Sequence, residues 1–282
     1  MSTRFSAACL ITWLSLTVVF CNLAGASSIE ETANRLFKAF TKTNQLETGL
    51  DVSPVAGVAV QDYYIALLRP TWGMDVGFSA VSVGGSESPL TGILLENMFT
   101  GTRSVIDRSY GIDMRAAPEL LFRVGSAELN DAIDRTEALA SLQSVIPGVR
   151  LSDALLADGT QHHHAVTSAA NLEVRMCVLG GELKLAGSTD WIDQLADYSV
   201  VMYDQNKTTI TDYRHSAAKH PLDLVLEVRD ALAHRGIQVQ RDDLIALGPL
   251  TDGVSVEELS RLRAVFHGLS DDQPLVIYMG FR

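Results

Sequence analysis

Apolar residues spaced three or four apart mark three stretches of the chain that we predict to be helical. They are Ser28 to Phe40, Ala56 to Leu68, and Leu222 to His234. Pro70 is expected to end the second helix, because proline removes a backbone donor and disfavours helical geometry in the residue before it. Gly236 is expected to end the third helix in a left-handed conformation.

Shorter apolar runs, alternating or continuous, predict strands. These runs are Trp72 to Val83, the second half of Ser88 to Phe99, Asn171 to Leu179, Val200 to Tyr203, Asp243 to Gly248 and Pro274 to Met279. Ala157 to Ser168 is polar and predicts a loop, whose adjacent His162, His163 and His164 cannot all face one metal ion. Strands outnumber helices and do not alternate with them, which favours an α+β fold.

The stretch from Gly111 to Asp153 joins two apolar runs through a predicted helix. The helical stripe comprises Leu129, Ala132, Ile133, Leu139, Ala140 and Leu142. Asn130 or Asp131 is its expected N-cap. The flanking runs contain charged residues, which a buried strand normally excludes. Such residues usually face a pocket or a partner, so we expect the functional site here.

The N-terminus has the pattern of a secretory signal peptide. Arg4 precedes the uncharged run Ala7–Cys21, and Ala24-Gly25-Ala26 supplies small residues for cleavage after about Ala26. The run is shorter than the roughly 20 residues that span a bilayer. We therefore expect a periplasmic or secreted protein with a signal peptide at 1–26, an N-terminal helix and connector at 27–55, and one domain at 56–282.

Composition narrows the classes of partner. The 282 residues are 47% hydrophobic and 20% charged, as in a globular protein, and the net charge is −12. That charge disfavours nucleic acid, and also anionic membranes once the signal is removed. Cys177 is the cysteine left after cleavage, so an intrachain disulfide is excluded and we expect a buried apolar role for it.

Several short motifs carry a family resemblance. They are Val60-Gln-Asp-Tyr63, Gly77-Phe78-Ser79, Pro89-Leu-Thr-Gly92, Arg115 to Val124, and Pro147 to Asp153. With them, the chain from about Ala56 to its end resembles the 2-keto-4-pentenoate hydratase and oxalocrotonate decarboxylase branch of the fumarylacetoacetase superfamily. The resemblance implies a mixed β-roll or barrel with flanking helices, preceded by short N-terminal helices. It also implies a hydro-lyase or decarboxylase, often homo-oligomeric.

The same resemblance implies a magnesium ion held by three carboxylates, which binds a 2-oxo acid beside a lysine. Here the family's Glu-x-Glu corresponds to Ala117-Pro118-Glu119, and Arg150 replaces the third carboxylate. Ser79 replaces the lysine. Glu119 is thus the one family ligand left. We expect no cofactor, or Mg²⁺ or Mn²⁺ only if the site persists in altered form.

Three interpretations remain open. In the first, Arg115, Arg150 and Ser79 bind a small 2-oxo or carboxylic acid without metal. In the second, the protein is a lyase with reassigned metal ligands. Candidate catalytic groups are then Ser79, Glu119 and Asp153. In the third, an ion pair between Arg150 and Glu119 closes a vestigial pocket in a protein that serves interactions with other proteins.

Overall fold

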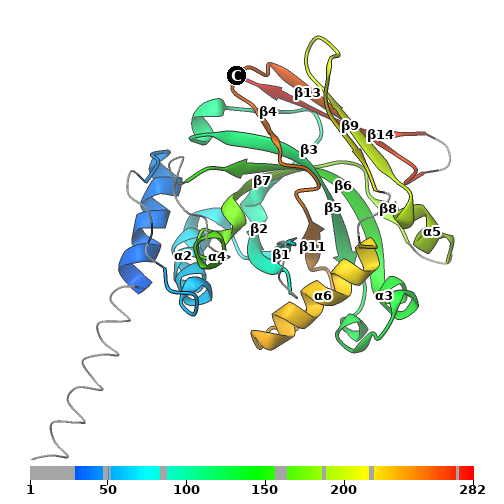
Figure 1. Cartoon of the computed structure of the whole chain (residues 1–282), viewed down its shortest axis with the longest axis horizontal. Helices are drawn as coiled ribbons and strands as arrows, with labels where there is room; N and C mark the ends of the chain where they lie inside the picture. The colour runs from blue at the N-terminus through cyan, green and yellow to red at the C-terminus, as the bar shows by residue number, and fades with distance from the viewer. Residues whose placement is uncertain are drawn as a thin grey trace, which may run out of the picture.

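The structure, a computed structural model (Figure 1), describes residues 29–46, 50, 52–82, 88–155, 164–185, 189–215, 219–270 and 273–282. The predicted signal peptide and its cleavage site lie outside these residues, as do Ser28, His162 and His163. In the part that is described, no helix is long and apolar enough to cross a membrane.

Two sheets form the body of the described chain. The larger has the order β2-β1-β11-β5-β6-β7-β3, with β12 beside β5 and β8 beside β6, and it curls on itself. The smaller has the order β10-β9-β13-β14-β4 and lies along one side of the larger, where β14 contacts β6 and β7. This is the expected mixed α+β roll.

The strands of the larger sheet are β1 (Asp75–Val81), β2 (Leu90–Leu95), β3 (Phe99–Gly101), β5 (Met114–Val124), β6 (Leu142–Asp153), β7 (Val174–Leu179), β8 (Leu183–Lys184), β11 (Leu244–Leu247) and β12 (Val254–Ser255). Those of the smaller sheet are β4 (Ser104–Ile106), β9 (Ser199–Tyr203), β10 (Thr209–Arg214), β13 (Arg261–His267) and β14 (Leu275–Phe281). Each apolar run that predicted a strand overlaps an observed strand. The sequence pattern missed two groups of strands. Some have only two or three residues, namely β3, β4, β8 and β12. The others, β10 and β13, have polar or charged residues at their exposed positions.

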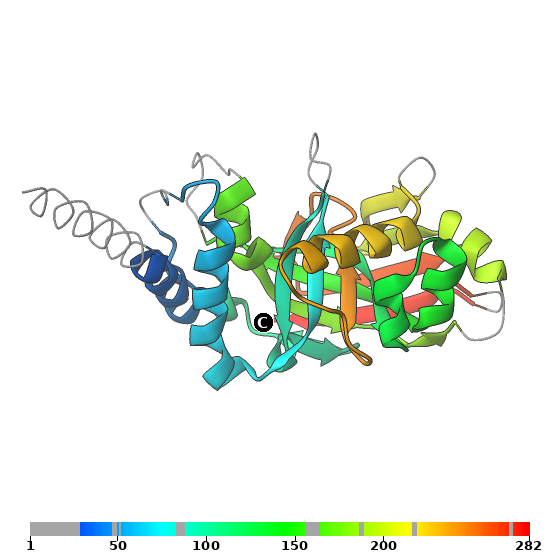
Figure 2. The same cartoon turned by 90° about the horizontal axis from the view of Figure 1, so that it is seen from below.

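The helices lie at the ends and on one side of the larger sheet (Figure 2). They are a helix over residues 29–42, α2 (Gly57–Trp72), α3 (Arg135–Ser141), α4 (His164–Ala169), α5 (Asp190–Ala196) and α6 (Pro221–His234). Short 3-10 turns are η1 (Glu96–Met98), η2 (Arg108–Tyr110), η3 (Ala127–Asp131) and η4 (Asn171–Glu173). Gly236 follows α6 with a φ of 74°, as predicted.

The predicted end of α2 at Pro70 is wrong. The helix continues to Trp72, and Gly73 closes it by donating from its backbone N–H to the Arg69 carbonyl over 3.0 Å. A proline in the last turn removes one hydrogen bond only. Trp72 is buried against the ring of Phe40, with 5.1 Å between centroids, and this contact favours the extra turn.

The predicted helix between β5 and β6 begins later than expected. Asn130 and Asp131 belong to η3, and Ile133 is 81% exposed. Asp134 is the N-cap of α3, because its carboxylate accepts from the backbone N–H groups of Thr136 and Glu137, both over 2.9 Å. The predicted apolar face of this helix was wrong at its end as well, because Leu142 is the first residue of β6.

His164–Ala169 was predicted as loop and is helix α4. It packs against the first turn of α2, where a Cβ on Gly57 would lie 2.6 Å from the Ala165 carbonyl oxygen. The glycine permits this close approach. Tertiary packing against α2, which a local polar pattern does not reveal, therefore stabilises the short helix.

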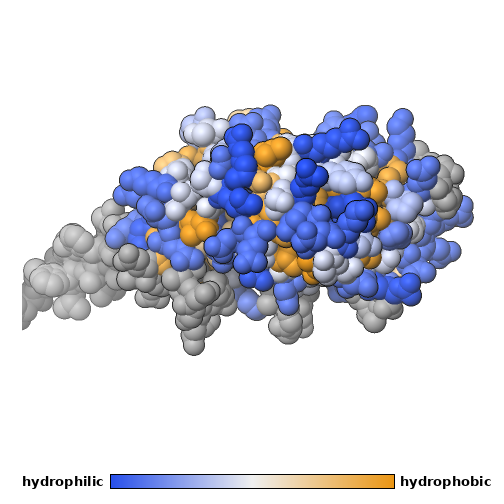
Figure 3. Space-filling view, turned by 90° about the horizontal axis from the view of Figure 1, so that it is seen from above, coloured by the Kyte–Doolittle hydropathy of each residue, from blue (hydrophilic) through white to orange (hydrophobic). Residues whose placement is uncertain are grey.

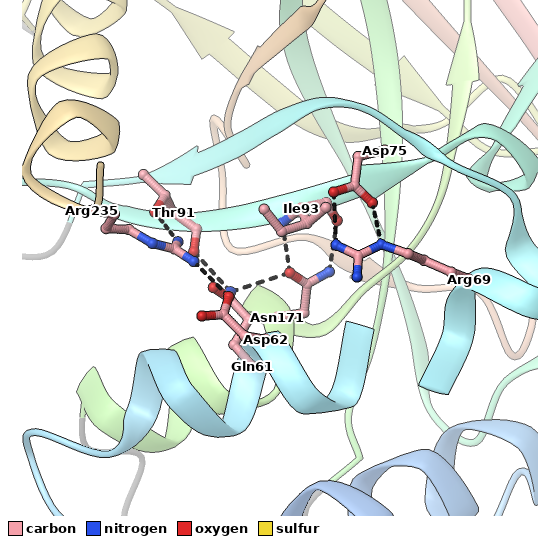
Figure 4. A network of polar contacts seen from close by, with 8 residues as sticks. All are labelled: Gln61, Asp62, Arg69, Asp75, Thr91, Ile93, Asn171 and Arg235. Atoms are coloured by element: carbon pink, nitrogen blue, oxygen red, sulfur yellow. Dashed lines mark hydrogen bonds and ion pairs between the residues drawn. The ribbon is translucent and has the colours of Figure 1, made fainter. Parts of the chain in front are cut away.

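A polar network joins α2 to the sheet and to α6 (Figure 4). Arg235 donates to Asp62 over 3.0 Å and to the Thr91 hydroxyl over 2.8 Å, while Arg69 and Asp75 form a two-bond ion pair. Asn171 is the buried centre of this network and contacts β2. The network holds η4, and hence Leu172, in position beside the candidate site.

Candidate functional site

The residues that the sequence singled out at separate points of the chain converge on one face of the larger sheet. Arg150 on β6 pairs with Ala117 on β5 and with Cys177 on β7. Residues directly opposite in a ladder share a face, as do residues two apart along a strand. Glu119 therefore lies on the same face as Ala117 and Arg150.

Ser79 joins this face through β11. It pairs with Ala246, which pairs in turn with Leu121, two residues beyond Glu119 on β5. The Ser79 hydroxyl accepts from the Arg150 guanidinium over 2.9 Å. The expected substitute for the family's lysine and the expected substitute for its third carboxylate are thus in direct contact.

Arg150 is buried and its guanidinium bonds within the chain. Besides Ser79, it donates to the Gly248 carbonyl over 3.0 Å, to the Ser152 hydroxyl over 3.0 Å, and to the Leu172 carbonyl. All these acceptors are uncharged. Burial lowers the pKa of Arg150, and the nearby Glu119 opposes that shift.

Glu119 is fully buried, and neither carboxyl oxygen accepts from an N–H or O–H group of the described residues, although the Cys177 thiol lies beside it. Burial raises its pKa, with Arg150 acting in the opposite direction. Two glycines enclose it. A Cβ on Gly248 would lie 2.7 Å from the Glu119 Cβ, and one on Gly148 would lie 3.2 Å from its Cγ. The backbone therefore approaches this side chain closely from two directions.

The predicted ion pair between Arg150 and Glu119 is not formed. The guanidinium donates to carbonyl and hydroxyl oxygens instead, and among the described residues the carboxyl group receives no N–H or O–H donor. Because burial favours the protonated, neutral form of Glu119, the Coulomb attraction that would draw the two groups together is weakened. Beside them Cys177 is buried as predicted, and burial raises its pKa.

Arg115 lies at the rim of the same face. It pairs with Ser152, is exposed, and donates to the Gly253 carbonyl over 3.0 Å. It is two strand positions from Ala117, so it can reach a ligand at the edge of the site but does not enter the buried part.

Asp153 faces away from this cluster. It pairs with Met114, and its Oδ1 accepts from the backbone N–H groups of Ile112 and Asp113 over 2.7 and 3.0 Å. Its Oδ2 lies 3.6 Å from Nε of Arg175, a buried residue at the register shift between β6 and β7. The structure thus separates Asp153 from Glu119 and places it in a buried ion pair with Arg175. Sequence reasoning missed Arg175, although a charge inside an apolar run was the available signal.

A cavity of about 120 Å³ opens at the carboxyl ends of the parallel strands β1 and β11. Its lining includes Ala80, Ser82, Leu247, Gly248, Pro249 and Leu250. Gly248 belongs to both the cavity and the buried cluster, because its carbonyl accepts from Arg150. The cavity is small and mostly apolar, so it suits a ligand far smaller than those of typical pockets of roughly 300–1,000 Å³.

The donor set does not fit the divalent cation that the family resemblance implies. Ala117 supplies a methyl group and Arg150 a positive charge where carboxylates would be needed, which leaves Glu119. Within the described ranges, no group of three or more His, Cys, Asp or Glu side chains is placed to hold a metal ion. Hard cations require several oxygen ligands, and a neighbouring guanidinium repels them.

Comparison with solved structures identifies the fold. The 4-oxalocrotonate decarboxylase from Pseudomonas putida G7, complexed with magnesium and adipate, superimposes with a TM-score of 0.76 at 19% identity, over 91% of this chain and 98% of that one. The same protein with calcium and acetate gives 0.74 at 19% identity and the same coverage. A 2-hydroxyhepta-2,4-diene-1,7-dioate isomerase from Mycobacterium marinum gives 0.50 at 11% identity, over 73% of this chain and 75% of that one.

No protein-family model matches the sequence, and a search of curated proteins gives no match either. The chain has the fold of the 4-oxalocrotonate decarboxylase, as the sequence resemblance indicated. Identity below 25% establishes the fold alone, so the site's chemistry follows from this chain's own residues.

Proposed function

We propose that this chain is an exported protein that binds a small 2-oxo or carboxylic acid without a divalent metal. Arg150 supplies the fixed positive charge. The observation that carries the proposal is the buried Arg150 guanidinium, which lies beside a carboxyl group that burial favours in its neutral form and contacts the wall of a small cavity.

The chemistry of the ligand follows from these groups. A guanidinium presents parallel N–H donors that match the two oxygens of a carboxylate. A carboxylate entering past Gly248 would replace the neutral acceptors, Ser79 and the Gly248 carbonyl, with a charged one. Protonated Glu119 can then donate to an oxo or carboxylate oxygen. The decarboxylase of similar fold was solved with adipate and with acetate, both carboxylates.

Two other functions each have one observation in their favour. Arg150 makes four hydrogen bonds to acceptors within this chain, which is also compatible with a closed, vestigial pocket. The protein would then act by binding other proteins. The unpartnered oxygens of Glu119 favour a lyase that keeps a metal with reassigned ligands.

Thermal unfolding in the presence of ligand tests the proposal. Oxalate or pyruvate at 100 times its Kd should stabilise the folded state by about 2.7 kcal/mol, a rise in Tm of roughly 5–10 °C. Arg150→Lys keeps the positive charge but loses the paired N–H donors of the guanidinium, so we expect at least about tenfold weaker binding of the acid. Arg123→Lys makes the same change elsewhere in the β5–β6 hairpin and should leave binding unaltered.

Metal titration separates the alternatives. A dose-dependent rise in Tm with Mg²⁺ or Mn²⁺ would contradict the metal-free proposal and favour the lyase. Absence of stabilisation by any small acid or metal would favour the vestigial pocket. The combined variant Ala117→Glu, Arg150→Glu and Ser79→Lys restores the family's pattern at these positions. It should gain metal binding and serves as the positive control.

A further inference from the structure

A second cavity lies on the smaller sheet, away from the site described above. Its volume is about 410 Å³, within the range of small-molecule sites. Figure 3 views the molecule from the side of this sheet, where hydrophilic side chains predominate and apolar ones lie between them. Nothing in the proposed function uses this cavity.

The register of the smaller sheet places an aromatic and cationic row across the cavity. Arg263 on β13 pairs with Tyr203 on β9 and with Tyr278 on β14, so the three side chains share one face. The Arg263 guanidinium lies 4.4 Å from the centroid of the Tyr203 ring, which fixes it over an aromatic surface. Tyr278 is 46% exposed on the other side.

The adjacent row leaves the floor of the cavity open. Arg261 pairs with Gly280, which pairs with Val105 on β4. A Cβ placed on Gly280 would meet no atom closer than 3.5 Å, so the glycine is not required by local packing. Its bare backbone instead creates a hollow between Arg261 and Val105.

Positive charge is concentrated here. Arg103, Lys207, Arg261 and Arg263 line the cavity, and the one carboxylate in its lining is Asp204. Asp204 accepts from the backbone N–H groups of Asn206 and Thr208, both over 2.8 Å, in the turn after β9.

None of these four cations forms an ion pair with another described residue. The whole chain, in contrast, has 34 acidic and 22 basic residues. Cations that converge on a hollow without partners raise the local concentration of anions.

We infer that this cavity binds a small organic anion with two or more negative charges on a planar, apolar body. The cations would take its carboxylate or phosphate groups, and Tyr203 and Tyr278 would contact its body. The volume favours a small molecule over a protein partner, because protein interfaces bury wide surfaces of about 800 Å² per partner and need no hollow. The site is independent of Arg150 and Glu119.

Isothermal titration calorimetry with two anionic probes and one neutral probe tests this inference. Benzene-1,3,5-tricarboxylate and 1-naphthyl phosphate carry the two possible anionic groups on a planar ring, and 1-naphthol carries the ring without charge. We expect one or both anions to bind, with an affinity that falls as salt is raised, and the neutral probe not to bind. The anion that binds more tightly shows whether the cavity prefers carboxylate or phosphate groups.

Charge-removing variants give the decisive comparison. Arg261→Gln with Arg263→Gln should weaken binding at least tenfold, whereas Arg241→Gln removes an exposed charge outside the cavity and should change affinity less than twofold. Arg241 and Arg261 are exposed and Arg263 is half-buried, and Tm values equal to that of the wild type would confirm that the variants fold. No binding by either anion, or binding unchanged in the double variant, would overturn the inference. The inference would also be wrong if the protein sedimented as a dimer, the double variant as a monomer, and no probe bound, because the cavity would then be part of a subunit interface.

Discussion

Glu119 shows, at the scale of one residue, how burial sets the chemistry of this site. Its carboxyl group has neither an N–H or O–H donor nor a formed ion pair among the described residues, and desolvation raises its pKa. A buried carboxylate without compensation is costly, so the neutral form is favoured. The same residue type that would ligate a cation elsewhere is here a potential hydrogen-bond donor.

The pH dependence of stability should reveal this state. Because the folded pKa is above the unfolded value near 4.5, the folded state binds more protons within that window. The free energy of unfolding should therefore fall as pH rises from the unfolded pKa through the folded one. Glu119→Gln mimics the neutral form and should remove that part of the decline.

Urea denaturation of wild type and Glu119→Gln from pH 4 to pH 9 provides the measurement. The variant should gain stability relative to wild type as pH rises, by about 1.4 kcal/mol for each unit by which the folded pKa exceeds the unfolded one. Parallel curves for the two proteins would show that Glu119 ionises normally. Glu182→Gln is the control, since the pKa of Glu182 is lowered instead.

At the scale of elements, Asn171 connects three parts of the fold. Its side chain accepts from the Ile93 N–H over 2.7 Å and donates to the Ile93 carbonyl over 2.8 Å, as an added strand would. Gln61 of α2 donates to the same oxygen over 3.2 Å and to the Thr91 carbonyl over 2.9 Å (Figure 4). Asn171 thereby fixes η4, whose Leu172 carbonyl accepts from Arg150.

Asn171→Ala should destabilise the protein by about 2–4 kcal/mol, because it leaves the buried Ile93 N–H and carbonyl without their side-chain partner and removes one of the two acceptors of Gln61. It should also weaken binding of a small acid at Arg150 if η4 shifts. Asn97→Ala is a suitable control, since Asn97 is exposed and donates once, to the Thr71 carbonyl over 3.0 Å. We expect a loss below about 1 kcal/mol there. If chemical denaturation gave equal losses of stability for Asn171→Ala and Asn97→Ala, the role assigned to Asn171 would be contradicted.

At the scale of the whole molecule, the helix over residues 29–42 is anchored to the sheet by the buried ion pair of Arg175 and Asp153. Arg175 donates to the Phe40 carbonyl over 2.8 Å and to the Tyr110 carbonyl, and its guanidinium lies 3.9 Å from the Phe40 ring centroid. Asp153 completes the pair at 3.6 Å. Asp153 therefore contributes to this anchor and lies apart from the candidate site.

Phe40→Ala should therefore cost about 3–5 kcal/mol, through the cavity it leaves and the loss of contact with Arg175. Phe37, on the same helix, is only half-buried, and Phe37→Ala should cost less than half as much. Chemical denaturation of both variants makes the comparison. If the two losses were equal, the anchor at Arg175 would contribute nothing beyond helix packing.

Apolar periodicity predicted the mixed α+β class, the long helices and most strands. Short motifs singled out Ser79, Ala117, Glu119 and Arg150, which the structure brings to one face of the larger sheet. Apolar periodicity and short motifs are local, so one chain contains them completely. Three-dimensional contacts decided the remainder: the extra turn of α2 at Trp72, the helix at His164–Ala169, and the partners of Arg150. Asp153 and Arg175 meet because a register shift turns a strand, and no local pattern encodes that. Packing and hydrogen bonding between distant segments fix such choices, because only the folded chain brings the competing partners together.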